Sequence, residues 1–103
     1  MEDKNTIIVK VAAGTPVAQL AGSLKAKYDE LKEGQSIAVR CVGSVPVNQA
    51  IKAIIVLNQF LAREGFTCSI HPSLIPSFEP IHGKGVSENI TVTVLALNFK
   101  RIQ

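Results

Sequence analysis

The sequence predicts a two-layer α+β domain of chain order βαβαββ, in which two helices lie on one face of a four-stranded mixed β-sheet. Three observations carry this prediction. Segments rich in β-branched residues alternate with two segments of helical periodicity. The first helical segment lies between two strand segments, which is the arrangement of a βαβ unit with parallel strands. After the second helix come two further strand segments with a glycine-flanked tip between them, which indicates a hairpin beside that unit.

The chain is short enough to form one domain with a single core. Its 103 residues are expected to form one unit, with residues 1–5 and 101–103 as frayed ends. Eleven lysines and arginines against eight acids give a net charge of +3, which permits nucleic-acid binding without requiring it. No apolar run is judged long enough to span a bilayer, and no signal peptide is visible. We therefore expect a cytoplasmic protein with no membrane partner.

The first strand and the first helix are predicted on either side of a break at residues 13–16. Residues 6–12 (TIIVKVA) are rich in β-branched residues, as strands are. Thr15 is the predicted N-cap and Pro16 the first helical residue, since proline lacks an N–H group that this position does not need. Gly34 is the predicted end of the helix. The predicted apolar stripe consists of Val17, Leu20, Ala21, Leu24, Tyr28 and Leu31.

The second strand, residues 36–42 (SIAVRCV), completes the predicted βαβ unit. Its side chains alternate between two faces, with Ile37, Val39 and Cys41 on one. Arg40 lies on the other face, between two apolar residues. Cys41 and Cys68, the two cysteines of the chain, both stand among apolar residues. We expect them to be reduced residues of the core, since free cysteine is commonly buried.

The long helix predicted within residues 44–65 is apolar around most of its circumference. Ser44 is the predicted cap, Pro46 lies in the first turn, and Gly65 suits the left-handed conformation just past the end. The polar side chains of this segment fall on one narrow stripe of Asn48, Lys52, Gln59 and Arg63. An amphipathic helix needs a much narrower apolar face than this. The sheet alone cannot cover it, so another helix or a second copy of the chain is implied.

The last part of the chain is predicted to hold two strands with an irregular segment between them. Residues 66–71 alternate as a strand, and residues 72–80 are expected to be irregular because they contain three prolines. Residues 83–85 (GKG) mark a flexible tip. Residues 89–100 read as the final strand, whose alternation changes phase near Leu95. Either a bulge re-phases this strand or both of its faces are covered.

No pattern of catalysis, metal ligation or cofactor binding is found. The histidines, His71 and His82, do not stand at ligand spacing from a second histidine, cysteine or acid pair. The motifs of nucleophile elbows, phosphate-binding loops and zinc sites are missing from the sequence. We therefore expect no catalytic, metal or cofactor site.

Two segments are candidates for binding. The turn at Gly43 and Ser44 opens the long helix, whose free N–H groups can hold a phosphate, and Asn48, Gln49 and Lys52 follow it. The alternative is an ordinary solvated helix face with a good cap. Lys84, at the glycine-flanked tip of the hairpin, could reach into a groove of a duplex. Its alternative is a mobile loop with one exposed lysine.

The same residues resemble a known family. Residues 41–54 (CVGSVPVNQAIKAI) look like the signature of the stage V sporulation protein S family, whose long helix opens with Asn-Gln-Ala-x-Lys-Ala. Residues 10–11 (KV), 20–24 (LAGSL) and 68–72 (CSIHP) resemble it at matching separations. The resemblance runs from about Ile7 to Phe99. The family is similar in turn to the Alba proteins, which are small dimeric chromatin- and RNA-binding proteins.

The resemblance implies an Alba-like fold, dimers and nucleic-acid binding. It implies a subunit contact near the long helix, backbone contacts from the loops at residues 13–15 and 43–44, and an arm at residues 80–86. The sequence departs from the Alba pattern in the first of these loops, which carries no lysine. The matching arginine of the second turn is missing too, and Arg40 stands on the strand instead. Fewer phosphate contacts mean weaker, less salt-dependent binding.

We therefore predict a non-enzymatic protein that binds the backbone of DNA or RNA as a homodimer or a higher assembly. The residues predicted to make the contact are Arg40, Gly43, Ser44, Asn48, Gln49, Lys52 and Lys84. The main alternative is a dimeric protein-interaction or regulatory module with little direct nucleic-acid binding. An enzyme of unrecognised type is a third.

Overall fold

The computed structural model describes residues 5–81 and 86–102, with side chains placed for residues 5–76 and 90–102. Its elements follow the predicted βαβαββ order: β1 (Thr6–Val11), α1 (Val17–Asp29), β2 (Ser36–Cys41), α2 (Ser44–Ala62), β3 (Phe66–Ile81) and β4 (Val86–Arg101). Lys84 and the rest of the predicted tip lie outside the described residues. At the other end of β4, the Ile102 N–H group donates to the Gly65 carbonyl at 2.8 Å, so this part of the predicted frayed end is held by the turn after α2.

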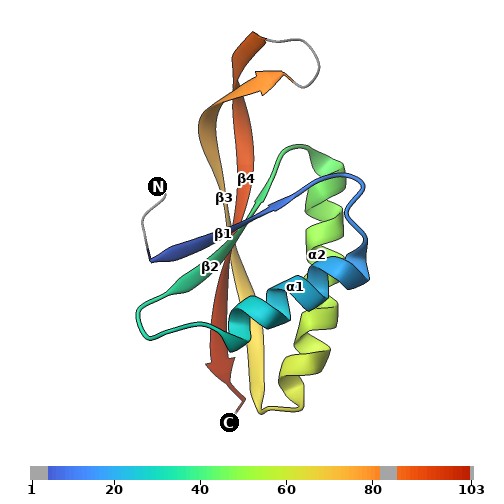
Figure 1. The fold of residues 1–103 in the computed structure, drawn as a ribbon, viewed down its shortest axis with the longest axis vertical. Coiled ribbons are helices and arrows are strands. Elements are labelled where there is room, and N and C mark those ends of the chain that lie inside the picture. Colours follow the sequence, from blue (N-terminus) through green and yellow to red (C-terminus); the bar gives the residue numbers. More distant parts are fainter. Residues whose placement is uncertain (1–4, 82–85, 103) are drawn as a thin grey trace.

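The strands form one mixed sheet in the order β1-β2-β4-β3. The strands β1 and β2 are parallel, as the βαβ prediction requires, and both other pairs are antiparallel. Both helices lie on the same side of the sheet (Figure 1). The predicted fold class is therefore confirmed, and the other face of the sheet carries no helix.

The main core lies between the helices and the sheet. Leu24 of α1 and Leu57 of α2 are fully buried there, against the side chains of Ile37, Val39 and Leu95 from the sheet. Both cysteines are free and buried, as predicted. Burial of this kind is the largest favourable contribution to folding, at about 25 cal/mol per Å² of apolar surface removed from water.

A second, smaller apolar cluster lies on the helix-free face of the sheet. It contains Ala38 of β2 with Val92 and Val94 of β4, all of them buried. The pairing of β4 with β3 and with β2 advances residue by residue, without a bulge. The change of phase near Leu95 is therefore explained by the second alternative: Leu95 and Leu97 face the helices, while Val92 and Val94 form the cluster on the other face.

The prediction of an irregular segment at residues 72–80 is wrong, because β3 continues to Ile81. Cys68 shows which backbone groups of β3 point away from β4. Its N–H and C=O groups both bond to the side chain of Asn58 of α2. Backbone groups of an antiparallel strand point to the partner at every second residue, so even-numbered residues of β3 point outward. Pro72 and Pro76 have this parity, and their missing N–H groups remove nothing from the sheet.

The predicted caps of both helices are shifted by one residue. The N-cap of α1 is Pro16, and that of α2 is Gly43, whose φ of 95° is in the region that favours glycine. The Thr15 hydroxyl instead accepts from the Ala12 N–H group at 3.1 Å and tightens the turn before α1. The α1 helix also ends at Asp29, before the predicted Gly34, and Leu31 packs against the core from the following loop. Gly65, with a φ of 83°, follows α2 as predicted.

The apolar circumference of α2 is covered in part by the sheet and in part by α1. The buried side consists of Pro46, Ala50, Ala53, Ile54, Leu57 and Leu61. By length and composition alone α2 would be able to cross a bilayer, which corrects the expectation that no such run exists. In this fold it is a core helix with one side on the sheet. Val45 and Ile55 on its outer side remain more than half exposed, at 53% and 55%.

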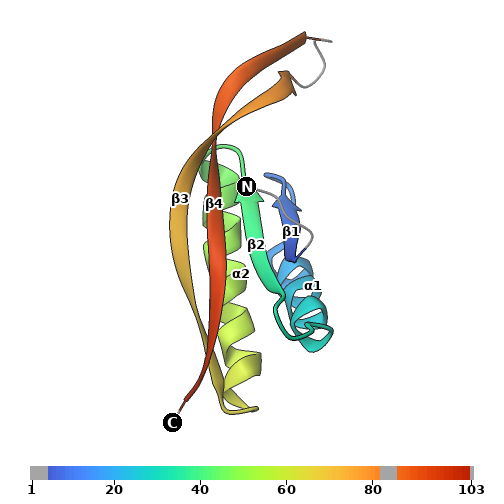
Figure 2. The ribbon, with the colours of Figure 1, turned by 90° about the vertical axis from the view of Figure 1, so that its left-hand side faces the viewer.

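The molecule is elongated because the β3–β4 hairpin extends past the rest of the sheet. Its principal extents are 48 × 27 × 20 Å. The β2 strand ends where Cys41 pairs with Thr93, so beyond this pair the hairpin has only two strands. Residues 74–81 and 86–93 are called the arm below. Figure 2 shows that the arm extends past both helices at the end of the molecule opposite the C-terminus and bends toward the side on which β1 lies.

Candidate nucleic-acid interface

A groove lies between the first turn of α2 and the base of the arm. Its lining residues from the helix are Gly43, Ser44, Val47 and Asn48. Its lining residues from the arm are Leu74 of β3 with Thr91 and Thr93 of β4. The positive φ of Gly43 turns the chain from β2 directly into the helix, and this sharp turn places the start of α2 beside the arm.

The electrostatics of the groove favour an anion. No acidic residue lies in the first turn of α2, and no side chain caps its free N–H groups. These groups carry the partial positive charge of the helix N-terminus. The hydroxyls of Ser44, Thr91 and Thr93 and the amide of Asn48 add further hydrogen-bond donors. This set is suited to the oxygens of a phosphate.

The structure brings four of the predicted contact residues together. Gly43, Ser44 and Asn48 line the groove, and Lys52 lies one turn further along the exposed side of α2. Among the residues whose side chains are described, 5–76 and 90–102, no acid forms an ion pair with Lys52. Its ammonium group is therefore available to an anion that sits at the groove.

The amide of Gln49 is used inside the molecule. Its Nε2 donates to the Thr15 carbonyl oxygen at 2.7 Å, and the side chain is half-buried. This bond ties α2 to the loop before α1, so the two loops expected to meet a nucleic-acid backbone are held beside each other. Gln49 thus positions the interface rather than lining the groove.

Arg40 is not part of the groove. It has the same parity in β2 as Ala38, which belongs to the cluster on the helix-free face, so it lies on that face. Gly43, Ser44 and Asn48 lie at the helix layer instead. Lys84 is outside the described residues, and its place relative to the groove stays a prediction.

The arm contributes residues to the groove that the sequence does not predict. Leu74 falls in the segment predicted to be irregular, and Thr91 and Thr93 fall in the predicted final strand, to which no site residue is assigned. In β4 the odd-numbered residues Leu95 and Leu97 face the helices. Thr91 and Thr93 are also odd-numbered, so their side chains lie on the same face of the sheet. The sequence alone does not assign Thr91 and Thr93 to this face, because a bulge near Leu95 would have placed them on the opposite one.

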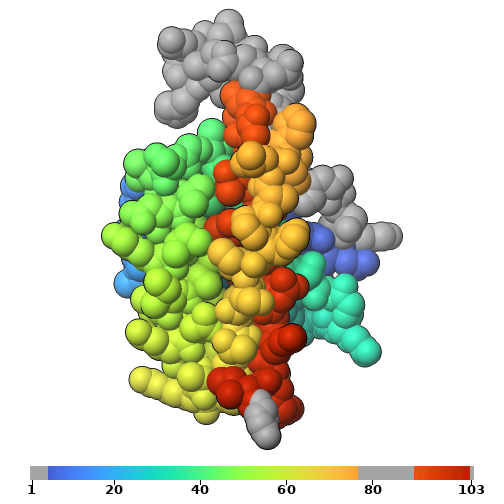
Figure 3. Space-filling view, turned by 180° about the vertical axis from the view of Figure 1, so that it is seen from behind, coloured from blue at the N-terminus to red at the C-terminus, as the bar shows by residue number. Residues whose placement is uncertain are grey.

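An apolar surface continues from the groove along α2. Figure 3 shows α2 and β3 side by side on this face of the molecule. Val47 and Ile51 are half-buried, Ile55 is 55% exposed and Leu74 is 69% exposed. We call these four residues the α2–β3 strip. Exposed apolar side chains gathered on one surface are typical of a protein interface.

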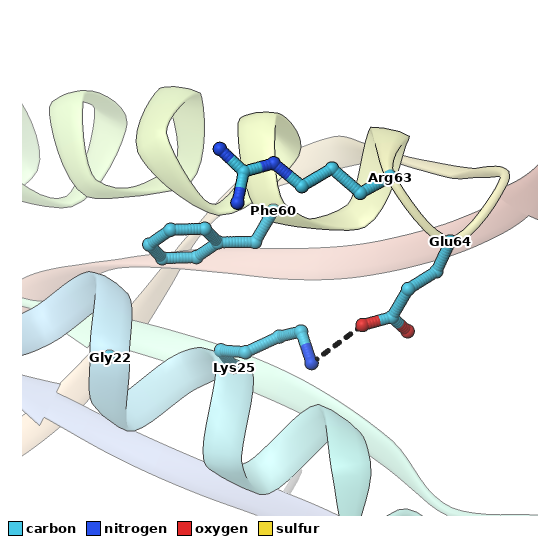
Figure 4. A pocket seen from close by; sticks show the side chains of 5 residues that line it. All are labelled: Gly22, Lys25, Phe60, Arg63 and Glu64. Atoms are coloured by element: carbon cyan, nitrogen blue, oxygen red, sulfur yellow. Dashed lines mark ion pairs between the residues drawn. The ribbon is translucent and has the colours of Figure 1, made fainter.

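A second hollow lies between the two helices, near the end of α2, and is lined by Gly22, Lys25, Phe60, Arg63 and Glu64 (Figure 4). Lys25 forms ion pairs with Asp29 at 2.7 Å and with Glu64 at 2.8 Å. These two carboxylates, Asp29 first, raise the pKa of Lys25 above its ordinary value. The charge of Lys25 is therefore used to hold α1 to the end of α2, and this hollow is not an anion site of the same kind.

Comparison with known proteins agrees with this geometry. The sequence pattern of the family described as Stage V sporulation protein S (SpoVS) matches residues 7–98. The chain belongs to the SpoVS family. The resemblance predicted from the sequence is confirmed, and the match includes the whole groove. No curated protein matches the sequence of this SpoVS-family chain.

Among solved structures, this SpoVS-family chain is similar to Alba from Thermoplasma volcanium. The two share 12% sequence identity over 88% of this chain and 98% of that chain, with a TM-score of 0.61. The likeness shows an Alba-like fold. A second structure, the precorrin-6y C5,15-methyltransferase from Geobacter metallireducens GS-15, shares 13% identity over 95% of this chain and 45% of that chain. Its TM-score of 0.41 is too low to support an argument.

Proposed function

We propose that this SpoVS-family chain is a non-enzymatic, cytoplasmic protein that binds the phosphate backbone of DNA or RNA as a homodimer. The observation that carries the proposal is the groove, where the uncapped start of α2 meets the hydroxyls of the arm. Lys52 supplies a cation one turn away. The resemblance of the family to nucleic-acid-binding Alba proteins supports the same reading.

Each part of the groove has a separate role in the proposal. A phosphate is held by the N–H groups at the start of α2 and by Ser44, while Asn48 donates to a neighbouring phosphate or sugar. Lys52 neutralises a phosphate and releases its counterion, which makes binding salt-dependent. Such contacts fix the position of the protein on the backbone and read no base sequence.

The proposed dimer contact is the α2–β3 strip. Two copies related by a two-fold axis would cover each other's exposed Ile55 and Leu74. The strip borders the groove, because Val47 and Leu74 belong to both surfaces. Pairing through the strip therefore brings two grooves near each other, and a long polyanion can contact both at once.

The test is binding of duplex DNA, RNA and single strands to wild-type protein and to Lys52→Glu across a salt series. The variant should bind more weakly, and the slope of log affinity against log salt should fall by about one, since one phosphate contact contributes about 0.9. Lys32→Glu is the matched control, because Lys32 is exposed in the loop after α1. Equal affinity of Lys52→Glu and wild type at every salt concentration would contradict the assignment.

The second candidate function is a dimeric protein-interaction or regulatory module. The exposed apolar character of the α2–β3 strip favours it, because the strip fits a protein surface better than a phosphate backbone. Light scattering with and without short DNA and RNA separates the two functions. A dimer whose mass does not change with either nucleic acid at low salt supports the second.

A further inference from the structure

The helix-free face of the sheet is a surface that the proposed function does not use. Its centre is the small cluster of Ala38, Val92 and Val94, against which Ile8, Ile75 and Ile90 pack. Beyond these isoleucines the face carries short polar side chains, among them the exposed Ser69 and Ser73 of β3. No helix lies on this face, and Lys10, Ser69, His71 and Lys100 on it are exposed, although the residues of the cluster itself are buried.

Each of the four strands places one basic side chain on this face. Side chains two residues apart in a strand lie on the same face, so Lys10 of β1 shares the face of Ile8, and Arg40 of β2 shares the face of Ala38. In β4, Lys100 lies on the same face as Val94, from which it is separated by an even number of residues. In β3, His71 lies on this face too, because its partner in β4 is Ala96. Lys10, His71 and Lys100 are exposed and Arg40 is half-buried.

The acids of the described region lie elsewhere. Among described side chains, those of Asp and Glu belong to the helices and the loops that follow them, and these are Asp29, Glu30, Glu33 and Glu64. The helix layer therefore carries charges of both signs, with Lys25 paired to Asp29 and Glu64, while the described charged side chains of the helix-free face are all basic. This separation of charge does not stabilise the fold, since it places like charges on one surface.

The register adds a specific arrangement. Lys10 and Arg40 are direct partners across the parallel pair β1–β2, so two cations stand on strands about 4.8 Å apart. Like charges directly opposite each other in a sheet repel. Lys100 lies six residues along β4 from Val94, the partner of Arg40, which corresponds to about 20 Å at roughly 3.4 Å per residue. The positive charge thus runs across the sheet over the length of several phosphates.

We propose that this helix-free face is a second binding surface for the phosphate backbone of a nucleic acid, with Lys10, Arg40 and Lys100 as its contacts. It lies on the opposite side of the sheet from the groove and does not depend on it. A second copy of this chain is a poor occupant, because stacking two such faces would bring their lysines and arginines together. A nucleic acid fits better than an apolar partner, because the apolar residues at the centre of the face, Ala38, Val92 and Val94, are already buried while Lys10 and Lys100 are exposed.

The test compares two double variants with equal loss of charge. In the face variant, Lys10→Gln and Lys100→Gln remove the exposed lysines of the helix-free face; in the control, Lys27→Gln and Lys32→Gln remove lysines of the helix layer. Lys52→Gln reports on the groove. Glutamine keeps most of the side-chain stem, and thermal unfolding checks that all variants fold alike. Binding of duplex DNA, single-stranded RNA and polyglutamate is measured by fluorescence anisotropy across a salt series.

The face variant should bind nucleic acid about 10-fold or more weakly than the control, with a salt slope reduced by about two. Its effect should add to that of Lys52→Gln, because the surfaces are separate. If the face variant binds like the control while Lys52→Gln is weakened, this proposal is wrong and the proposed function stands. If Lys52→Gln binds like wild type while the face variant is weakened, the groove assignment fails instead. Binding of polyglutamate but of no nucleic acid would overturn both.

Discussion

Asn58 is the residue that connects the long helix to the edge of the sheet. Its Nδ2 donates to the Cys68 carbonyl at 3.0 Å, and its Oδ1 accepts from the Cys68 N–H group at 2.7 Å. The same Oδ1 accepts from the Thr67 hydroxyl at 3.3 Å. One side chain thus takes the place of a neighbouring strand at the outward-facing backbone of Cys68. Without it, a buried residue would have two unpaired backbone groups.

Asn58→Ala should therefore destabilise the protein by about 1–3 kcal/mol, the cost of leaving buried polar groups without partners. Urea unfolding measures the change. Gln59→Ala is the control, because the neighbouring side chain is exposed and its truncation should change the free energy of unfolding by less than about 0.5 kcal/mol. A loss of stability no larger than that of the control would show that water replaces the amide at Cys68.

The Cys68 thiol makes stability depend on alkaline pH. Burial raises its pKa from an ordinary value of 9.0 to about 11, against a smaller lowering by the backbone of Asn98. Between these pH values the unfolded chain has lost the thiol proton and the folded chain still holds it. The unfolded state then binds fewer protons, so the free energy of unfolding falls as pH rises.

From pH 9 to pH 11, the free energy of unfolding should decrease by on the order of 2 kcal/mol more in wild type than in Cys68→Ala. Urea unfolding at several pH values measures both slopes. The slopes are compared, rather than the stabilities, because the alanine also removes packing. Lys25 and Tyr28 titrate in both proteins and cancel in the comparison. Parallel slopes would mean that the Cys68 thiolate is solvated in the folded state.

At the scale of elements, the outer edge of β3 is closed to further strands. Pro72 and Pro76 lack the N–H groups that a neighbouring strand would need, Pro80 has the same parity, and Asn58 occupies the backbone of Cys68. Natural sheets protect long exposed edges with such features, because open edges pair with other chains. The prolines that broke the pattern of a strand in the sequence are thus part of how this strand stays unpaired.

The double substitution Pro72→Thr and Pro76→Thr restores two outward donors on a strand of 16 residues. It should leave the protein folded and promote further association through the edge, seen as species larger than wild type in size-exclusion chromatography and as thioflavin T binding. Ser69→Thr with Ser73→Thr is the control, because it raises strand propensity at the inward parity and adds no outward donor. If both double variants stay at the wild-type size, the prolines do not guard this edge.

The elements show which features a sequence can reveal. Periodicity and β-branched residues were enough to locate both helices and the first two strands, because those signals are local. The full length of β3 was not predicted, because Pro72 and Pro76 destabilise a strand only where the missing N–H group would face a partner strand. The same limit affected Arg40. Both faces of β2 are apolar, and only the placement of the helices decides which face Arg40 is on.

In the candidate site, the residues of α2 could be predicted from the sequence, and those of β3 and β4 could not. Gly43, Ser44, Asn48 and Lys52 follow from the start of one helix. Leu74 comes from a strand that is distant in sequence and joins them only through the tertiary structure. Gln49 could be placed on the helix from its spacing, but its bond to Thr15 required the packing of one loop against the other.

At the scale of the whole molecule, the exposed strip along α2 and β3 predicts the oligomeric state. Ile55→Lys places a charge in the middle of the proposed dimer contact, where it would have to be buried without a partner. The dissociation constant of the dimer should rise about 10-fold or more, which corresponds to about 1.4 kcal/mol. Analytical ultracentrifugation over a concentration series measures it.

The control for the dimer is Ala26→Lys, which adds the same charge on the exposed side of α1. Nucleic-acid binding should weaken in Ile55→Lys as well, because two linked grooves hold a polyanion more tightly than one. A wild-type protein that sediments as a monomer at every concentration would refute the dimer. So would an Ile55→Lys variant that dimerises like the control.

The position of β4 has a consequence for how the protein is made. This strand comes last in the described chain, yet it lies inside the sheet, between β2 and β3. During synthesis the ribosome releases β1, α1, β2 and α2 while the strand that will cover β2 is still unmade. Until β4 has been made, the edge of β2 and the apolar side of α2 stay uncovered on the nascent chain, and surfaces of this kind are prone to aggregation and are commonly protected by chaperones.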